Sequence, residues 1–456
     1  MSNPFQLNFT LKQHTPIIHF QHEQEGATLR ATEVKPKLDR FIMEKLTGKI
    51  AHEAAAEFKR RALLREGEDA KPEWKNWLVG KGKSEHVALD YKMRITDAKP
   101  VVKNGDFKLI TEKIDQGPNS KKPILSQTGV KVELHLFSIE LKEEIEKHYQ
   151  LFFLIENFGT RQSKGWGCYT EESMKCEGVV EALFKSNLPV YILKNFQYNS
   201  NSVDGFYQSI LKFWRVLKSG NNFPAYNGRP AVYIKAAIFK YMTKNNLRWD
   251  KRWMKQRLNE VISSHSTRVS IPNLTGVRLK KTNHPNDATI NHPSPDHCND
   301  SHFGTNSELD ISTLAAPYRF GRAMLGLAEH LEFRANNGFT FQFRIKGLNG
   351  IERFKAPVTF KVFENKLFAI VHDPKAMLDK EFQFEVQAKK QNLNPPPPLL
   401  NEGPPMEVMD TTGNPKILKT PINSTEFSLE NFLDEFFPCQ GFERLKSSNY
   451  KTFCNA

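Results

Sequence analysis

The chain has 456 residues and a mass of 52.5 kDa, which is enough for two or three domains that each bury a hydrophobic core. Hydrophobic residues make up 39% of it and charged residues 25%. No apolar run approaches the roughly 18 residues of a membrane-spanning helix and no signal peptide is evident, so we expect neither a membrane protein nor a secreted one. The five cysteines lack the spacing of a metal site and favour a reducing compartment, which predicts a cytoplasmic protein.

Positive charge is the chain's strongest compositional feature. The formal net charge is +14 and the isoelectric point is about 9.3. Polyanions are therefore the natural partners, because each phosphate that Lys or Arg neutralises releases counterions. The last 64 residues hold 8 acidic and 5 basic residues, so residues 1–392 carry a net charge of +17. This distribution predicts that the folded part, rather than the tail, binds the polyanion.

In the first half of the chain, segments with the hydrophobic period of a strand alternate with segments that have the period of a helix. The patterns predict, in chain order, a strand over 5–20, a helix over 37–50 directly after Pro36, an Ala-rich helix over 51–67, and strands over 130–139 and 148–159 on either side of a charged helix over 140–147. A glycine-rich loop leaves the last of these strands. The first half is therefore expected to be α+β.

The second half repeats the order of strand and helix. We expect a strand over 188–198, a helix over 202–220, a helical run opened by Arg229-Pro230 over 227–242, and strands over 339–347 and 356–371. An arginine precedes a lysine at similar spacing in both halves, as Arg30 and Lys35 and again as Arg229 and Lys235. The two pairs suggest an internal duplication.

Three segments near the end of the chain differ in composition from the rest. Residues 282–310 are polar and turn-rich and are expected to form a long loop, and residues 393–405 read as a polyproline linker. The segment 428–437 places its apolar residues on one helical face, with Ser428 as the cap. We expect this acidic amphipathic helix to be a docking element on a flexible tether; the alternative is a terminal helix packed on its own domain.

The glycine-rich loop reads "FGTRQSKGWG" over 158–167. Its spacing fits neither phosphate-loop template of nucleotide enzymes, which removes that class of protein. A plain surface turn remains an alternative. The favoured interpretation is a loop for single-stranded nucleic acid, in which Arg161 and Lys164 neutralise phosphates, glycines let backbone amides approach them, and Trp166 stacks on a base or simply packs.

Histidines offer two further candidate sites. A cluster over 284–302 lacks the paired spacing of zinc ligands, so we expect no metal there. His14, His19 and His22 flank the end of the first strand and could supply acid–base chemistry, but the sequence offers no partner base or oxyanion group. Common catalytic signatures are also missing, so we expect a protein that is not an enzyme and needs no cofactor.

Three motifs together resemble those of the RAMP superfamily of CRISPR proteins. They are "KQHTPIIHF" over 12–20, "LRATEVK" over 29–35 and the glycine-rich loop. Two later segments, "RPAVYIKAAIFK" over 229–240 and "RFKAPVTF" over 353–360, are similar to the family of subunit one of the type III-B Cmr complex. This resemblance implies two tandem ferredoxin-like (RRM-like) βαββαβ domains at 1–187 and 188–392, the second with an insertion at about 282–310, and a tail over 393–456 with a Pro-rich linker and a short amphipathic helix.

The resemblance also implies a function in antiviral defence. Such a subunit is non-catalytic, binds RNA and caps the crRNA filament near the crRNA 3′ region and the 5′ part of the target RNA. Its partners would be crRNA, target RNA, the filament backbone RAMP and a neighbouring end-cap RAMP, with no membrane. The candidate RNA-binding residues are Arg30, Lys35, Gly159, Arg161, Lys164, Gly165, Trp166, Gly167, Arg229 and Lys235.

Two alternatives remain open at this point. A metal-independent endoribonuclease that processes CRISPR transcripts would share the fold and the glycine loop, with His14 or His19 as the general base. A general single-stranded RNA-binding protein would share the charge.

Overall fold

A computed structural model describes most of the chain. The described residues are 3–18, 28–97, 100–102, 124–126, 129–196, 209–211, 213–223, 232–234, 236–265, 317–327, 330–334, 339–347, 354–390, 406–408 and 416–453. The predicted polar loop over 282–310 and the polyproline linker over 393–405 lie outside them, as do His19 and His22.

The chain forms two compact units. Unit 1 contains Met1–Ile210, Thr359–Ile370 and Glu443–Ala456, and unit 2 contains Leu211–Val358 and Val371–Phe442. The two units are interleaved along the chain, whereas the motifs predict three domains in succession. The domain boundaries at 187 and 392 stay a prediction.

Unit 1 contains a four-stranded sheet whose strands all pair antiparallel. The strand order is β2-β5-β1-β6, with β1 at Gln6–Gln13, β2 at Tyr91–Asp97, β5 at Val130–Leu136 and β6 at Tyr169–Glu171. Alternation sets its two faces, because Leu7, Phe9 and Leu11 are buried while Asn8 and Lys12 are exposed. The predicted opening strand exists, but it ends at Gln13 rather than at residue 20.

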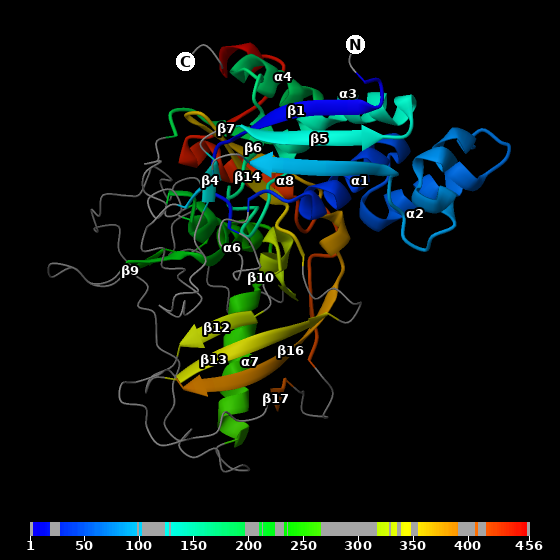
Figure 1. Cartoon of the computed structure of the whole chain (residues 1–456). Coiled ribbons are helices and arrows are strands. Elements are labelled where there is room, and N and C mark those ends of the chain that lie inside the picture. The colour runs from blue at the N-terminus through cyan, green and yellow to red at the C-terminus, as the bar shows by residue number, and fades with distance from the viewer. Residues whose placement is uncertain are drawn as a thin grey trace. The chain divides into compact units, whose positions relative to one another are not determined.

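Helices cover one face of this sheet. They are α1 at Ala31–Thr47 and α3 at Ile139–Ile155, which lie behind the strands in Figure 1, while α2 at Ala51–Leu63 packs on α1 and α4 at Cys176–Lys185 packs on α3. The predicted helix over 51–67 is confirmed, and the helix predicted after Pro36 begins earlier, at Ala31.

The strand predicted over 148–159 is wrong. Its residues up to Ile155 form the last turns of α3, which starts where the Ser138 hydroxyl accepts from the Leu141 amide at 3.2 Å. Leu141, Ile145 and Tyr149 are buried at helical spacing and continue into Phe152. An apolar run this short has no period of its own, so the tertiary packing of α3 decides its structure. The glycine-rich loop consequently follows a helix.

A second sheet in unit 1 joins segments that are far apart in the chain. Its order is β14-β15-β7-β19, with β7 at Val190–Leu193, β14 at Val358–Phe363, β15 at Lys366–Val371 and β19 at Glu443–Arg444. The strand predicted over 188–198 exists as the shorter β7, and the segment predicted as one strand over 356–371 forms two, β14 and β15. Two short strands, β3 at Pro100–Val102 and β4 at Ile124–Ser126, pair with each other.

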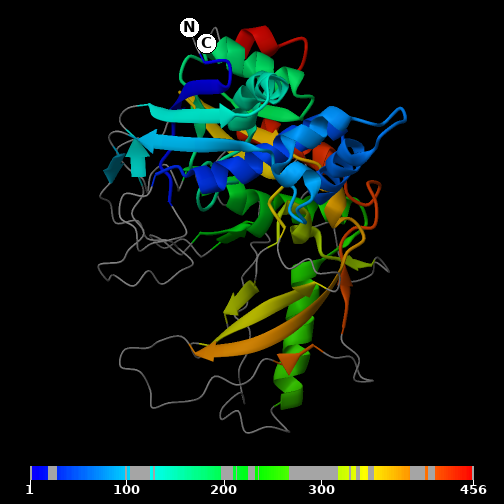
Figure 2. The same cartoon turned by 45° about the vertical axis from the view of Figure 1, so that its right-hand side comes forward.

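Unit 2 is built around an antiparallel sheet beside a long helix. The sheet contains β12 at His330–Arg334, β13 at Phe339–Gly347, β16 at Glu381–Lys390, β17 at Met406–Glu407 and β18 at Leu418–Lys419. The helix α7, at Asp250–His265, lies beside β13 and β16 in Figures 1 and 2. The Trp253 ring of α7 lies 5.5 Å from the Phe384 ring of β16.

The remaining elements of unit 2 correct one prediction and agree with another. They are β8 at Asn221–Phe223 paired with β9 at Val232–Ile234, β10 at Arg248–Trp249 paired in parallel with β11 at Tyr318–Arg319, and the helices α6 at Ala237–Lys244 and α8 at Leu429–Phe436. The helical run predicted from Arg229 is wrong in its first part, since β9 precedes a helix that begins only at Ala237. Of the helix predicted over 202–220, the described part contains a π-helical turn at Arg215–Ser219.

The amphipathic helix near the end of the chain exists, but the expected docking role is wrong. Ser428 caps α8 as predicted, accepting from the Asn431 amide at 3.2 Å. The apolar face of the helix is buried within unit 2, where the Phe432 ring lies 5.2 Å from the Tyr241 ring of α6. Burial of this apolar face is more favourable in free energy than its exposure on a tether. The helix therefore packs on its own domain, which is the alternative that the sequence left open.

Across the described part of the chain the class is mixed α and β with several antiparallel sheets, as predicted. No described helix combines the length and the apolar character needed to cross a membrane.

Candidate nucleic-acid interface

The glycine-rich loop of unit 1 runs from the end of α3 to β6. An antiparallel bridge between Asn157 and Cys168 closes its base. Gly159, Gly165 and Gly167 have φ angles of 78°, 76° and 63°, and Arg161 has 57°. Four left-handed residues within nine positions coil the segment into a tight loop, and three of them are glycines because an L side chain is strained there.

Two of these glycines are also required by space. A Cβ atom on Gly159 would lie 2.6 Å from the Ile18 carbonyl oxygen, and one on Gly167 would lie 2.0 Å from the Phe158 carbonyl oxygen. Both obstacles are backbone atoms. The glycines therefore bring the loop close to the protein's own backbone.

The backbone amides of the loop point largely inward. Internal hydrogen bonds take up the amides of Phe158, Gly159, Thr160, Lys164, Gly165, Gly167 and Cys168. Typical acceptors are the carbonyl oxygens of Pro16 and Ile18, at 2.9 and 2.7 Å, which follow β1. The expected amide cradle for phosphates is therefore wrong for these seven positions, because the glycines serve the internal packing of the loop.

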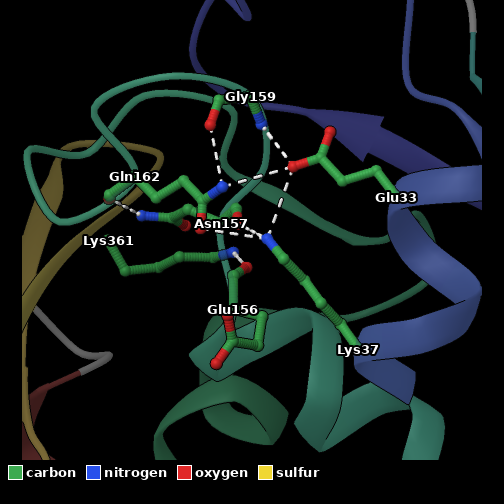
Figure 3. Close-up of polar contacts among 7 residues, drawn as sticks. All are labelled: Glu33, Lys37, Glu156, Asn157, Gly159, Gln162 and Lys361. Carbon is green, nitrogen blue, oxygen red and sulfur yellow. Dashed lines mark hydrogen bonds and ion pairs between the residues drawn. The ribbon is translucent and has the colours of Figure 1, made fainter. Parts of the chain in front are cut away.

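A polar network fastens the loop to α1 (Figure 3). The Glu33 carboxylate accepts from the Gly159 amide at 2.8 Å and from the Gln162 side chain at 3.2 Å. The Lys37 ammonium donates to the Asn157 carbonyl and to the Gln162 side-chain oxygen, both at 2.9 Å, and lies 3.4 Å from Glu33. These groups are partly buried, so their main role is to fix the shape of the loop.

Lys361 of β14 binds the end of α3, where the loop starts. Its ammonium donates to the carbonyl oxygens of Phe153 and Glu156, at 2.5 and 2.9 Å, which are acceptors left free at the end of α3. The side chain of Asn157 ties β14 to the loop by donating to the carbonyls of Phe360 and Gln162. Burial lowers the pKa of Lys361 to about 8, and this cation is held without a salt bridge among the described residues.

The structure separates the predicted RNA-binding residues into groups. Arg161 and Lys164 are half-buried at the turn of the loop, and Arg30 is half-buried at the cap of α1. Arg229 and Lys235 lie outside the described residues. RNA contacts at these positions stay predictions.

Two other predicted residues have structural tasks. Trp166 is fully buried, so of its two predicted roles the structure supports packing rather than stacking on a base. The Lys35 ammonium lies 2.8 Å from both the Asp39 carboxylate and the Leu89 carbonyl oxygen, and 4.2 Å from the centre of the Tyr91 ring. These contacts hold α1 to the start of β2.

His14 lies in a half-buried position after β1. Its Nε2 is 2.7 Å from the Thr170 hydroxyl, and its ring packs on Phe363. Burial, with Lys361 and Lys12 nearby, lowers the pKa of His14 to about 3, so the imidazole is neutral at physiological pH. Among the described residues no group of three or more His, Cys, Asp or Glu side chains could hold a metal ion.

Sequence reasoning missed the residues that shape the loop. Lys37 and Glu33 lie one helical turn apart on the polar face of α1, which is an ordinary surface pattern. Lys361 carried a stronger signal, since "VTFKVF" places a lysine inside a short strand in which only Thr359 is also polar. Such a lysine is either at an edge or held by buried acceptors.

Comparison with known families now identifies the class of protein. The Cmr1 N-terminal domain matches residues 5–221, and the Cmr1 C-terminal domain matches residues 233–451. Both matches come in order and cover nearly the whole chain, so it is a subunit of the RNA-containing Cmr effector complex of type III-B CRISPR systems. The chain belongs to the Cmr1 family, which confirms the resemblance. No curated protein and no solved structure matches it significantly.

Proposed function

We propose that the chain is a non-catalytic, RNA-binding subunit that caps the crRNA filament of the Cmr complex near the crRNA 3′ region and the 5′ part of the target RNA. The observation that carries this proposal is the match of both Cmr1 domains on a chain with a net charge of +14. A filament RAMP and an end-cap RAMP are the proposed protein neighbours, in the cytoplasm.

The fold of unit 1 supports a ferredoxin-like domain. The order β1, α1, β2, β5, α3, β6 is a βαββαβ sequence once α2 and the short β3–β4 pair are set aside as insertions. Its sheet order β2-β5-β1-β6 places the first and third core strands at the centre. We extend the tandem arrangement to the C-terminal half as a proposal.

The surroundings of His14 support a role without catalysis. An RNA-cleaving general base needs a pKa near the working pH and access to the ribose hydroxyl. His14 is held against Thr170 and Phe363, and its pKa of about 3 is far from this range. The endoribonuclease alternative therefore gains no support from His14.

Reversing the charge of Arg161 and Lys164 together tests the loop as an RNA contact. With both changed to Glu, we expect the RNA dissociation constant to rise at least about tenfold near 0.1 M salt, because two phosphate contacts become repulsive. The salt dependence should flatten by about 1.4 in slope, at roughly 0.7 per contact for a single strand.

The measurement is fluorescence anisotropy with a labelled crRNA. The matched control is Lys71→Glu with Lys75→Glu, which changes the net charge equally at exposed positions beside α2. Equal affinities of the loop variant and this control would remove Arg161 and Lys164 from the interface.

A further inference from the structure

The four-stranded sheet of unit 1 has one face that α1 and α3 do not cover. In Figure 1 the strands β1, β5 and β2 lie side by side in front, with these helices behind them. The inward side chains belong to the core, as Leu134 of β5 does. The outward side chains on β1, β5 and β2 are Gln6, Asn8, Thr10, Lys12, Lys131, Glu133, His135, Lys92, Arg94 and Thr96.

Strand register brings four basic residues of this face into one band. Lys131 lies opposite Thr10 on β1 and opposite Thr96 on β2. Lys12 is two residues beyond Thr10, and Arg94 is two residues from Thr96, so each is a diagonal neighbour of Lys131 at about 7–8 Å between backbones. Lys92 follows Arg94 at about 7 Å along β2. The band, defined as Lys12, Lys131, Arg94 and Lys92, crosses three strands with near-even spacing.

The charges of this basic band are not neutralised within the described part of the chain. All four side chains are exposed, and none forms an ion pair or a hydrogen bond with a described residue. Glu133 is the register partner of Arg94, yet the two form no ion pair. A second carboxylate, Glu172, lies at the edge of the face, where its amide donates to the Thr10 carbonyl oxygen. Four cations against two carboxylates leave the face positive.

The chemistry of the face favours a nucleic-acid backbone over a protein. Protein interfaces centre on aromatic and aliphatic side chains, and no outward residue of β1, β5 or β2 is apolar. Lys and Arg with Asn, Gln and Thr between them are the groups that bind phosphates and sugars. His135 is the one ring among these outward residues, so contacts to phosphates should dominate and depend little on sequence.

We propose that this face is an RNA-binding surface, on which the basic band holds the backbone of a single strand through its phosphates. The inference rests on the proposed function of the chain and adds a location that the sequence motifs do not include. It also fits the engagement of Lys35, Lys37 and most loop amides in internal contacts, which leaves the loop fewer groups for RNA.

The test uses the full chain and a labelled single-stranded oligouridine, which separates backbone from base recognition. For Arg94→Glu with Lys131→Glu, we expect the dissociation constant to rise at least about tenfold near 0.1 M salt and the slope of log affinity against log salt to fall by about 1.4. The neutral pair Arg94→Gln with Lys131→Gln should show a smaller loss in the same direction. The control Lys71→Glu with Lys75→Glu should stay within about twofold of wild type.

The possible outcomes distinguish a failure of this inference from a failure of the proposed function on which it rests. If the Arg94 and Lys131 variant matches the control in affinity and salt slope, RNA does not bind at the sheet face, while the proposed function stands. Unchanged RNA affinity with loss of co-purification with other Cmr subunits would also overturn the inference, because the face would then bind protein. A wild-type chain that binds no RNA, alone or in the complex, would contradict the proposed function itself.

Discussion

Gly167→Ala is expected to destabilise unit 1 by about 3 kcal/mol or more. Two costs act together at this position. An alanine in the left-handed region costs about 1–2 kcal/mol, and its Cβ would lie 2.0 Å from the Phe158 carbonyl oxygen, which is fixed by the hydrogen bond between the Phe158 amide and the Gly167 carbonyl. The loop must shift to relieve this clash, and its contacts with Pro16 and Ile18 would then be lost.

Differential scanning calorimetry and hydrogen exchange of the loop amides measure this effect. The matched control is Gly178→Ala in α4, where a Cβ meets nothing within 4 Å and alanine favours the helix by up to about 1 kcal/mol. We expect the two alanine variants to shift the melting temperature in opposite directions. A Gly167 variant as stable as wild type would show that the loop does not have the described backbone conformation.

Wild-type stability should rise with pH, relative to Lys361→Met, between pH 8 and pH 10. Burial holds the pKa of Lys361 at about 8, against 10.5 for an ordinary lysine, so in this interval the unfolded chain binds a proton that the folded chain does not. The free energy of unfolding then increases by about 2 kcal/mol between pH 8 and pH 10, at 1.36 kcal/mol per pH unit. The neutral amine still donates to the carbonyls of Phe153 and Glu156.

The methionine variant keeps the length of the side chain and cannot titrate, so it removes the contribution of every other group from the comparison. Chemical unfolding of both proteins at several pH values provides the measurement. A difference in the free energy of unfolding between the two proteins that stays constant from pH 8 to pH 10 would contradict a lowered pKa of Lys361.

Much of the fold follows from local patterns in the sequence. The alternation in β1 and β13 and the Ala-rich composition of α2 identified these elements. The end of α3 could not be identified, because Phe152, Phe153, Leu154 and Ile155 are all buried and no polar face marks the helix.

Pairing between strands that are distant in the chain was the second feature that the sequence could not predict. The sheet β14-β15-β7-β19 joins Val190, Leu367 and Glu443, whose neighbours in the chain carry no sign of this pairing. The same holds for the open sheet face, where register alone aligns Lys12, Lys131 and Arg94. Each residue by itself looks like an ordinary solvent-exposed position in an alternating strand.

The loop shows the same division between local and non-local information. The run of glycines predicted a loop, and the structure has one, with Gly159, Gly165 and Gly167 in the left-handed region. Their spacing could not tell whether the amides face a ligand or the protein, since that depends on the carbonyls of Pro16 and Ile18 about 140 residues away.

Photo-crosslinking within the assembled Cmr complex tests the central claim, RNA binding by this chain, most directly. The complex would carry crRNA and target RNA labelled with 4-thiouridine, and mass spectrometry would locate the crosslinked peptides. We predict crosslinks from the crRNA 3′ region or the target 5′ region to peptides of β1, β2 or β5, or to the peptide with Arg161 and Lys164. Crosslinks confined to the other subunits, with this chain present at full occupancy, would contradict the claim.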